Sequence, residues 1–131
     1  MKCLDTSLLI DITRDHPAAQ RAARAALLDG AVTTEINAFE LYVGAHEAGQ
    51  PVLRKMEAAE TALRGLDILP LTHRAALKAA ETGSLLRSRG QEVGALDVLI
   101  AAIAQTNGVD TVVTADAEDF RRIPGIRVET Y

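Results

Sequence analysis

Asp97 lies in the most apolar stretch of the chain and is the only ionisable residue between Val93 and Ala104. The stretch predicts a helix that is apolar on all sides and therefore buried. An unpaired carboxylate in such a helix costs several kcal/mol by order of magnitude. Because Asp97 is near the expected helix start, it could instead accept hydrogen bonds from orphan backbone amides. Of these two roles, we favour that of a metal ligand.

Glu40 is a second acidic residue in an apolar setting. It shares an i, i+3, i+4, i+7 helical stripe with Ile36, Phe39 and Val43. This spacing predicts that Glu40 faces the core. Two interpretations stay open: a rim residue whose stem packs while its carboxylate reaches water, or a functional carboxylate.

Asp5 follows a short apolar segment, and Asp116 and Asp119 follow the β-branched segment 111–114. Taken singly, each is typical of a turn or a helix cap. Taken together they favour a metal site over separate caps, because carboxylates that converge stay ionised only when cations neutralise them. Sites built from carboxylates alone suit Mg²⁺ or Mn²⁺ rather than zinc. Two such ions roughly 4 Å apart can activate water and stabilise the leaving oxygen in phosphodiester cleavage.

Alternating strands and helices would bring these acids together. We expect strands at 2–5, 31–33, 67–71, 111–114 and 126–128. We expect helices at 7–14, 17–29, about 34–48, 51–64, about 72–90, 96–106 and 117–122, with Ser7, Thr34 and Thr72 as N-caps. The alternation implies a parallel sheet covered on both faces, which binds ligands beyond the carboxyl ends of its strands. Asp5 and Asp116 should therefore emerge at the same edge.

The composition indicates one globular domain spanning residues 1–131, with 48% hydrophobic residues and only 3% aromatic ones. A net charge of −4 means that nucleic-acid chemistry would depend on local arginines and bound cations. No apolar run reaches about 18 residues, so no membrane span is expected. The acidic Asp5 near the start argues against a secretory signal, and the single cysteine, Cys3, suits a buried position in a cytoplasmic protein.

The ordered set of segments resembles the PIN-domain family, and most closely its VapC-type toxin ribonucleases of type II toxin–antitoxin systems. The likeness covers nearly the whole chain and rests on Leu4-Asp5-Thr6-Ser7, Phe39-Glu40-Leu41, residues 96–102, Thr114-Ala115-Asp116 and Asp119-Phe120. The resemblance implies a three-layer α/β/α fold with a short, mainly parallel sheet. It also implies a Mg²⁺- or Mn²⁺-dependent endoribonuclease, a homodimer, and a cognate antitoxin that blocks the site.

Carried onto this sequence, the resemblance assigns the three main acids to Asp5, Glu40 and Asp97. Asp116 is our first choice for the fourth acid and Asp119 the second. In the implied mechanism Asp5 and Asp97 hold the principal ion, Glu40 and Asp116 complete its surroundings or hold a weaker second ion, and a metal-activated water attacks the phosphate. Small hydroxyl residues that line such sites match Thr6, Ser7 and Thr114.

RNA would need further contacts, and the chain supplies few aromatic residues for base stacking. Arginines that could contact phosphates, or could be ordinary surface residues, are Arg14, Arg87, Arg89, Arg121 and Arg122. The Ala-rich helices expected at 17–29 and 51–64 have small apolar faces. They could pack in the core of one subunit, or form a dimer face or an antitoxin groove.

Three rival functions remain at this stage. A phosphatase that forms an aspartyl phosphate would want a second Asp two residues after Asp5, where this chain has Ser7. A DNA-acting flap nuclease of the same superfamily would be longer and richer in acids. A PIN-fold module that binds RNA or protein without cleavage is disfavoured because all four acid positions are filled. Cleavage of RNA but not DNA would separate the nucleases.

Overall fold

The computed structural model describes residues 1–47, 49 and 51–131, and its centre is a five-stranded sheet. The strands are β1 (Lys2–Leu4), β2 (Ala31–Thr34), β3 (Asp67–Leu69), β4 (Thr111–Val113) and β5 (Arg127–Glu129). They lie in the order β3-β2-β1-β4-β5, and every neighbouring pair is parallel. After β3 the chain returns to the far side of β1. The topological switch point, where such sheets bind ligands, therefore lies between β1 and β4.

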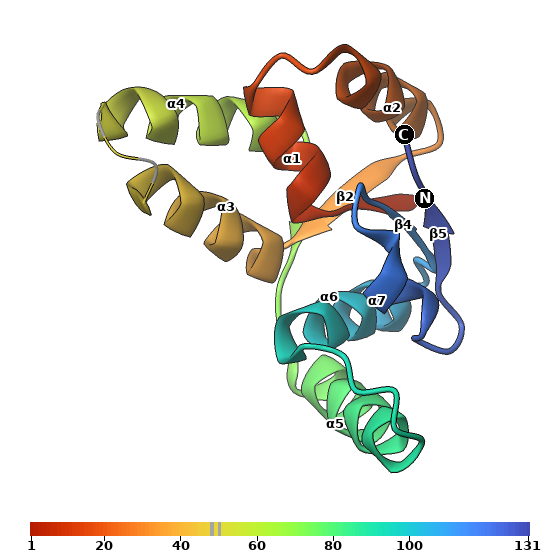
Figure 1. Cartoon of the computed structure of the whole chain (residues 1–131). Coiled ribbons are helices and arrows are strands. Elements are labelled where there is room, and N and C mark those ends of the chain that lie inside the picture. Colours follow the sequence, from red (N-terminus) through yellow and green to blue (C-terminus); the bar gives the residue numbers. More distant parts are fainter. Residues whose placement is uncertain (48, 50) are drawn as a thin grey trace.

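Helices cover both faces of the sheet, as expected from the sequence (Figure 1). They are α1 (Thr6–Thr13), α2 (Pro17–Leu28), α3 (Glu35–Glu47), α4 (Val52–Leu63), α5 (His73–Ser88), α6 (Ala95–Thr106) and α7 (Ala117–Arg121). Helices α1 to α4 pack on one face and α5 to α7 on the other, which confirms the three-layer fold. In the described part of the chain, no helix is both long and apolar enough to cross a membrane.

Each face of the sheet has its own core because successive strand residues point in opposite directions. On β1, Cys3 faces the core under α5 and α6, and Leu4 faces the core under α1 to α4. The thiol of Cys3 is fully buried, and this burial raises its pKa to about 12. The expectation of a buried, small hydrophobic cysteine is confirmed.

Side-chain caps explain several helix starts. Thr34 Oγ1 accepts a hydrogen bond from the Asn37 N–H (3.2 Å), and Thr72 Oγ1 accepts one from the Ala75 N–H (3.1 Å), as expected for N-caps. The expected cap at Ser7 is wrong, because α1 begins one residue earlier, at Thr6.

Other observed strand boundaries differ from the predicted ones by one or two residues. Strand β3 stops at Leu69, two residues before the expected end, because Pro70 has no N–H to donate to the sheet. Strand β1 stops at Leu4. Strand β5 begins at Arg127, one residue late. The predicted helix end at Ala48 lies outside the described residues.

The prediction that Glu40 lies in a core-facing stripe with Phe39 is wrong. The buried residues of α3 are Asn37, Ala38, Leu41 and Ala45, whereas Phe39 is 56% exposed. The helix packs against α1 and α4, and Ala38 and Leu41 lie in the core that it shares with them. Glu40 is half-buried.

Candidate metal centre

Asp5 lies at the carboxyl end of β1, at the N-cap position of α1, and is 6% exposed. Its Oδ2 accepts hydrogen bonds from Thr114 Oγ1 (2.7 Å) and Ser7 Oγ (3.3 Å). Its Oδ1 accepts one from Asn37 Nδ2 (3.2 Å). Burial raises the pKa of the Asp5 carboxyl, and the hydrogen bonds from Thr114 and Ser7 act in the opposite direction. These donors hold the carboxylate in one orientation despite its burial.

Glu40 is tied to the same edge of the sheet through Thr6. Thr6 Oγ1 donates to Glu40 Oε1 over 2.7 Å and accepts from Asn37 Nδ2 over 3.0 Å. The loop after β4 is fastened similarly, because the Ala115 N–H donates to Ser7 Oγ over 2.9 Å. All three hydroxyl residues proposed from the sequence, Thr6, Ser7 and Thr114, therefore contact site carboxylates.

Asp97 lies in the first turn of α6, whose N-cap is Gly94. Burial raises the pKa of the Asp97 carboxyl to about 7, and four other carboxylates add to this effect. In decreasing order of effect they are Asp5, Glu40, Asp119 and Asp116. The folded chain thus gathers five acids from four distant segments into one electrostatic environment. No side-chain hydrogen bond to a backbone amide satisfies Asp97 in the described structure, which argues against the capping role.

The two candidates for the fourth acid differ in their surroundings. Asp116 is exposed at the N-cap position of α7, and its side chain makes no capping hydrogen bond. Asp119 is half-buried in the first turn of α7 and lies 3.7 Å from Arg122 Nη1. Asp119 raises the pKa of Asp97 more than Asp116 does. The choice between them stays a prediction.

The donor set fits a hard divalent cation. Within residues 1–47, 49 and 51–131, no Lys, Arg or His forms an ion pair with Asp5, Glu40, Asp97 or Asp116. The same residues include no group of three acidic, His or Cys side chains already close enough to form a complete metal-ligand set. Mg²⁺ is commonly held by one or two carboxylates and keeps several waters, so it does not need such a set.

The five arginines proposed as RNA contacts differ in their surroundings, and their role stays a prediction. In the described structure, Arg122 is the one that pairs with a site acid, Asp119, and it also pairs with Glu118 (3.2 Å). Arg87 pairs with Glu92 (3.5 Å). Arg14 lines a separate groove, and Arg89 and Arg121 are exposed.

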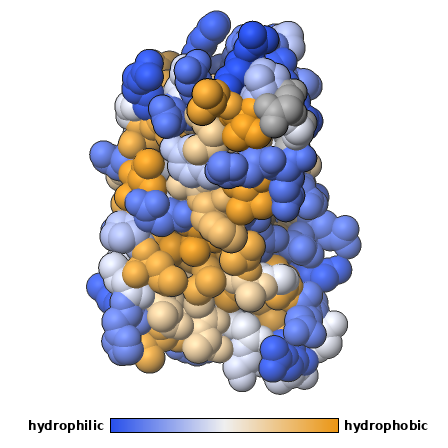
Figure 2. Space-filling model, turned by 90° about the vertical axis from the view of Figure 1, so that its left-hand side faces the viewer, coloured by the Kyte–Doolittle hydropathy of each residue, from blue (hydrophilic) through white to orange (hydrophobic). Residues whose placement is uncertain are grey.

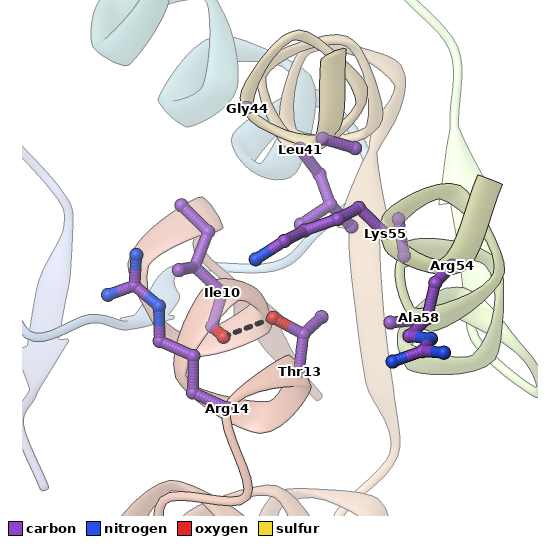
Figure 3. A pocket seen from close by; sticks show the side chains of 10 residues that line it. Ile10, Thr13, Arg14, Leu41, Gly44, Arg54, Lys55 and Ala58 are labelled. Carbon is purple, nitrogen blue, oxygen red and sulfur yellow. Dashed lines mark hydrogen bonds between the residues drawn. The ribbon is translucent and has the colours of Figure 1, made fainter. Parts of the chain in front are cut away.

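That groove has a volume of about 280 Å³ and lies between α1, α3 and α4 (Figure 3). Lys55 extends across it towards α1, and the walls are mainly apolar. Its lining residues are Ile10, Thr13, Arg14, Leu41, Gly44, Ala45, Arg54, Lys55, Ala58 and Ala59. Of the two Ala-rich helices, α4 lines the groove, whereas α2 does not and packs into the core through Ala19 and Ala26.

The side of the molecule where α3 and α4 lie carries a broad apolar area (Figure 2). Large apolar side chains that are exposed on the helices include Phe39 (56%), Leu53 (80%) and Leu96 (38%). An apolar surface of this kind is typical of a protein that binds a partner.

Asn37 is the site residue that the sequence analysis missed. It is fully buried and bonds both Asp5 and Thr6, although it carries no charge. One sequence signal could have revealed it. Asn37 is four residues before Leu41 and eight before Ala45, so it is a polar residue on the buried face of α3.

A PIN-domain family model matches residues 2–126. The chain therefore belongs to the PIN-domain family, as the resemblance predicted. It is 30% identical over 128 residues to the tRNA(fMet)-specific endonuclease VapC of Salmonella typhimurium, and the match covers 98% of this chain and 96% of that protein.

Solved structures support the same relationship. The DNA-bound VapBC structure from Salmonella typhimurium matches with a TM-score of 0.87 and 29% identity, over 98% of this chain and 96% of that one. The VapBC2 structure from Rickettsia felis, bound to a promoter DNA fragment, matches with a TM-score of 0.89 and 21% identity, over 99% and 98% of the two chains. The Rickettsia structure supports the fold alone. The sequence relative and the Salmonella structure confirm the likeness to VapC-type proteins.

Proposed function

We propose that this protein is a Mg²⁺- or Mn²⁺-dependent endoribonuclease and the toxin of a toxin–antitoxin pair. The observation that carries this proposal is that Asp5, Glu40, Asp119 and Asp116 all act electrostatically on Asp97, while no cationic side chain among the described residues pairs with Asp97. The endonuclease name of the Salmonella relative supports the same chemistry.

In this proposal Asp5 and Asp97 hold the principal ion, and Glu40 and either Asp116 or Asp119 complete its surroundings. When bound, the ion supplies a water of lowered pKa and neutralises negative charge on the scissile phosphate. The protein contributes orientation: Thr114 and Thr6 donate 2.7 Å hydrogen bonds that fix Asp5 and Glu40. No Ser, His or Cys nucleophile is required.

RNA is the proposed substrate, and transfer RNA is the first class to test. The relative is described as specific for tRNA(fMet). The identity of 30% leaves the exact RNA of this chain open to experiment, so a panel should include initiator tRNA, other tRNAs, ribosomal RNA and a messenger RNA.

An antitoxin is the proposed protein partner, because the similar Salmonella structure is a VapBC structure, and a VapBC structure from Mycobacterium tuberculosis that is 25% identical to this chain belongs to a family of toxin–antitoxin systems. The groove between α1, α3 and α4 suits an amphipathic segment with acidic residues, since its apolar walls are bordered by Arg14, Arg54 and Lys55. A homodimer, implied by the family resemblance, would cover part of the exposed apolar surface.

The decisive experiment compares RNA cleavage by the wild type, Asp97→Asn and Asp110→Asn. Asp110 is an exposed acid that precedes β4 at the opposite end of the strand, so its variant is a matched control. We expect Mn²⁺- or Mg²⁺-dependent cleavage by the wild type and the control, and a loss of at least about 100-fold in Asp97→Asn. RNA binding without cleavage in the wild type would favour the inert module, and equal cleavage of DNA would refute the assignment as a ribonuclease.

A further inference from the structure

Asn37 occupies a buried position in which every polar atom of its side chain has a partner. It is 0% exposed. Its Oδ1 accepts hydrogen bonds from Thr34 Oγ1 (2.6 Å) and from the Thr34 N–H (3.2 Å). Because two donors face this oxygen, the amide cannot be flipped without burying two unpaired donors. The amide nitrogen must therefore point towards the end of β1.

The two hydrogens of Asn37 Nδ2 are both used there. One is donated to Asp5 Oδ1 over 3.2 Å and the other to Thr6 Oγ1 over 3.0 Å. Since Thr6 accepts from Asn37, its single hydroxyl hydrogen is directed to Glu40 Oε1, 2.7 Å away. The buried amide of Asn37 thus determines which groups donate and which accept in the hydrogen bonds that orient Asp5 and Glu40.

This arrangement leaves Oε2 of Glu40 available to bind a cation. Glu40 Oε1 is occupied by Thr6, and no described residue donates a hydrogen bond to Glu40 Oε2. Groups that hydrogen-bond to metal-ligating side chains orient them, and their loss typically weakens metal binding about 10- to 100-fold.

We infer that Asn37 is a positioning residue that holds Asp5 and Glu40 in the orientation needed to bind a divalent cation. The inference rests on the proposed function, since it assumes that these carboxylates bind the ion. Asn37, an uncharged residue of α3, would then contribute to the affinity of the site for the divalent cation.

The test measures Mn²⁺ affinity by electron paramagnetic resonance of the free ion, on the full chain without RNA. Asn37→Ala removes both arms of the network, and Thr6→Val removes only the arm to Glu40. The matched control is Thr33→Val, which removes an equally buried hydroxyl that donates to the Leu4 carbonyl (2.8 Å) and makes no hydrogen bond to a carboxylate in the described structure. Urea unfolding of each variant reports whether it folds, and Thr6→Val still tests the inference if Asn37→Ala does not.

We expect the dissociation constant for Mn²⁺ to rise about 10- to 100-fold in Asn37→Ala and less in Thr6→Val, with Thr33→Val within about threefold of the wild type. Adding Thr6→Val to Asn37→Ala should change the affinity less than Thr6→Val does alone, because the two residues act through one chain of hydrogen bonds. Additive effects, or an Asn37→Ala affinity equal to that of Thr33→Val, would overturn the inference.

The same measurements distinguish a failure of the proposed function from a failure of the inference about Asn37. If Asp97→Asn binds Mn²⁺ as tightly as the wild type, the carboxylate cluster is not the metal centre, and both proposals fall. If Asp97→Asn loses Mn²⁺ while Asn37→Ala and Thr6→Val keep it, the centre stands and only the role of Asn37 is refuted.

Discussion

Replacing Asp97 by Asn should stabilise the metal-free protein at neutral and alkaline pH. In the folded chain, burial and four neighbouring carboxylates raise the pKa of Asp97 from 3.8 to about 7. For a fully buried group, this difference in pKa between the unfolded and folded chain corresponds to a loss of about 4 kcal/mol in the free energy of unfolding. Asp97 is only half-buried, so solvent screening reduces the effect, and we expect a gain of about 1–2 kcal/mol at pH 8.

The pH dependence follows from the direction of the pKa change. Between pH 3.8 and about 7, the unfolded chain has released the Asp97 proton while the folded chain still holds it. The free energy of unfolding of the wild type therefore falls as the pH rises through this range, and then levels off. The amide that replaces the carboxyl in Asp97→Asn does not titrate, so the two proteins should be equally stable near pH 4 and diverge above it.

Urea unfolding followed by circular dichroism suits this measurement, because the chain has no Trp for fluorescence. The titration would be run with EDTA from pH 4 to 8, and then repeated at pH 8 with Mg²⁺. Saturating Mg²⁺ at about 100 times its dissociation constant should stabilise the wild type by about 3 kcal/mol and leave the variant almost unchanged. A stability difference that is the same at pH 4 and pH 8, or an equal gain in Asp110→Asn, would refute the reasoning.

Three other outcomes test the packing and electrostatics. Phe120→Ala empties a position that is 1% exposed, and should lower the free energy of unfolding by about 3–5 kcal/mol; a loss below about 1 kcal/mol would mean that the α7 core is not packed as described. Tyr131→Phe removes the 2.7 Å hydrogen bond from the phenol to Asp11, and should cost about 1–2 kcal/mol in urea unfolding; an unchanged midpoint would contradict this. In carbon NMR titrations of the metal-free protein, Asp119→Asn should lower the Asp97 pKa more than Asp116→Asn does, and the reverse order would favour Asp116 as the nearer acid.

The sequence alone located much of the fold and several acids of the candidate site, because both follow from periodic patterns and topology. Strand-helix alternation predicts a parallel sheet, and the edge rule then brings Asp5 and Asp116 together without knowledge of any contact. Asp97 was identified because an isolated carboxylate is conspicuous in an apolar helix. Local sequence carries all of this information.

The α3 region shows what local sequence could not provide. Phe39 is a large apolar residue, yet it is exposed, because the orientation of α3 is set by its tertiary packing against α1 and α4. Asn37 was missed since a search for charge and hydroxyl groups passes over an amide. Asn37 acts through its hydrogen bonds to Thr6 and Asp5. These residues precede it by 31 and 32 positions, so only the folded chain shows the contacts.

The thiol of Cys3 is a natural reporter of the opening of the core between the sheet and helices α5 and α6. Cys3 is on the middle strand, with β2 on one side and β4 on the other, and it is the only cysteine in the chain. Because its side chain lies in the core under α5 and α6, a thiol reagent can reach it only after that helix layer moves away from the sheet and the thiolate forms in water. The rate of labelling in native buffer therefore reports how often the core between the sheet and α5 and α6 opens, and a cation or partner that stabilises the folded chain should lower this rate.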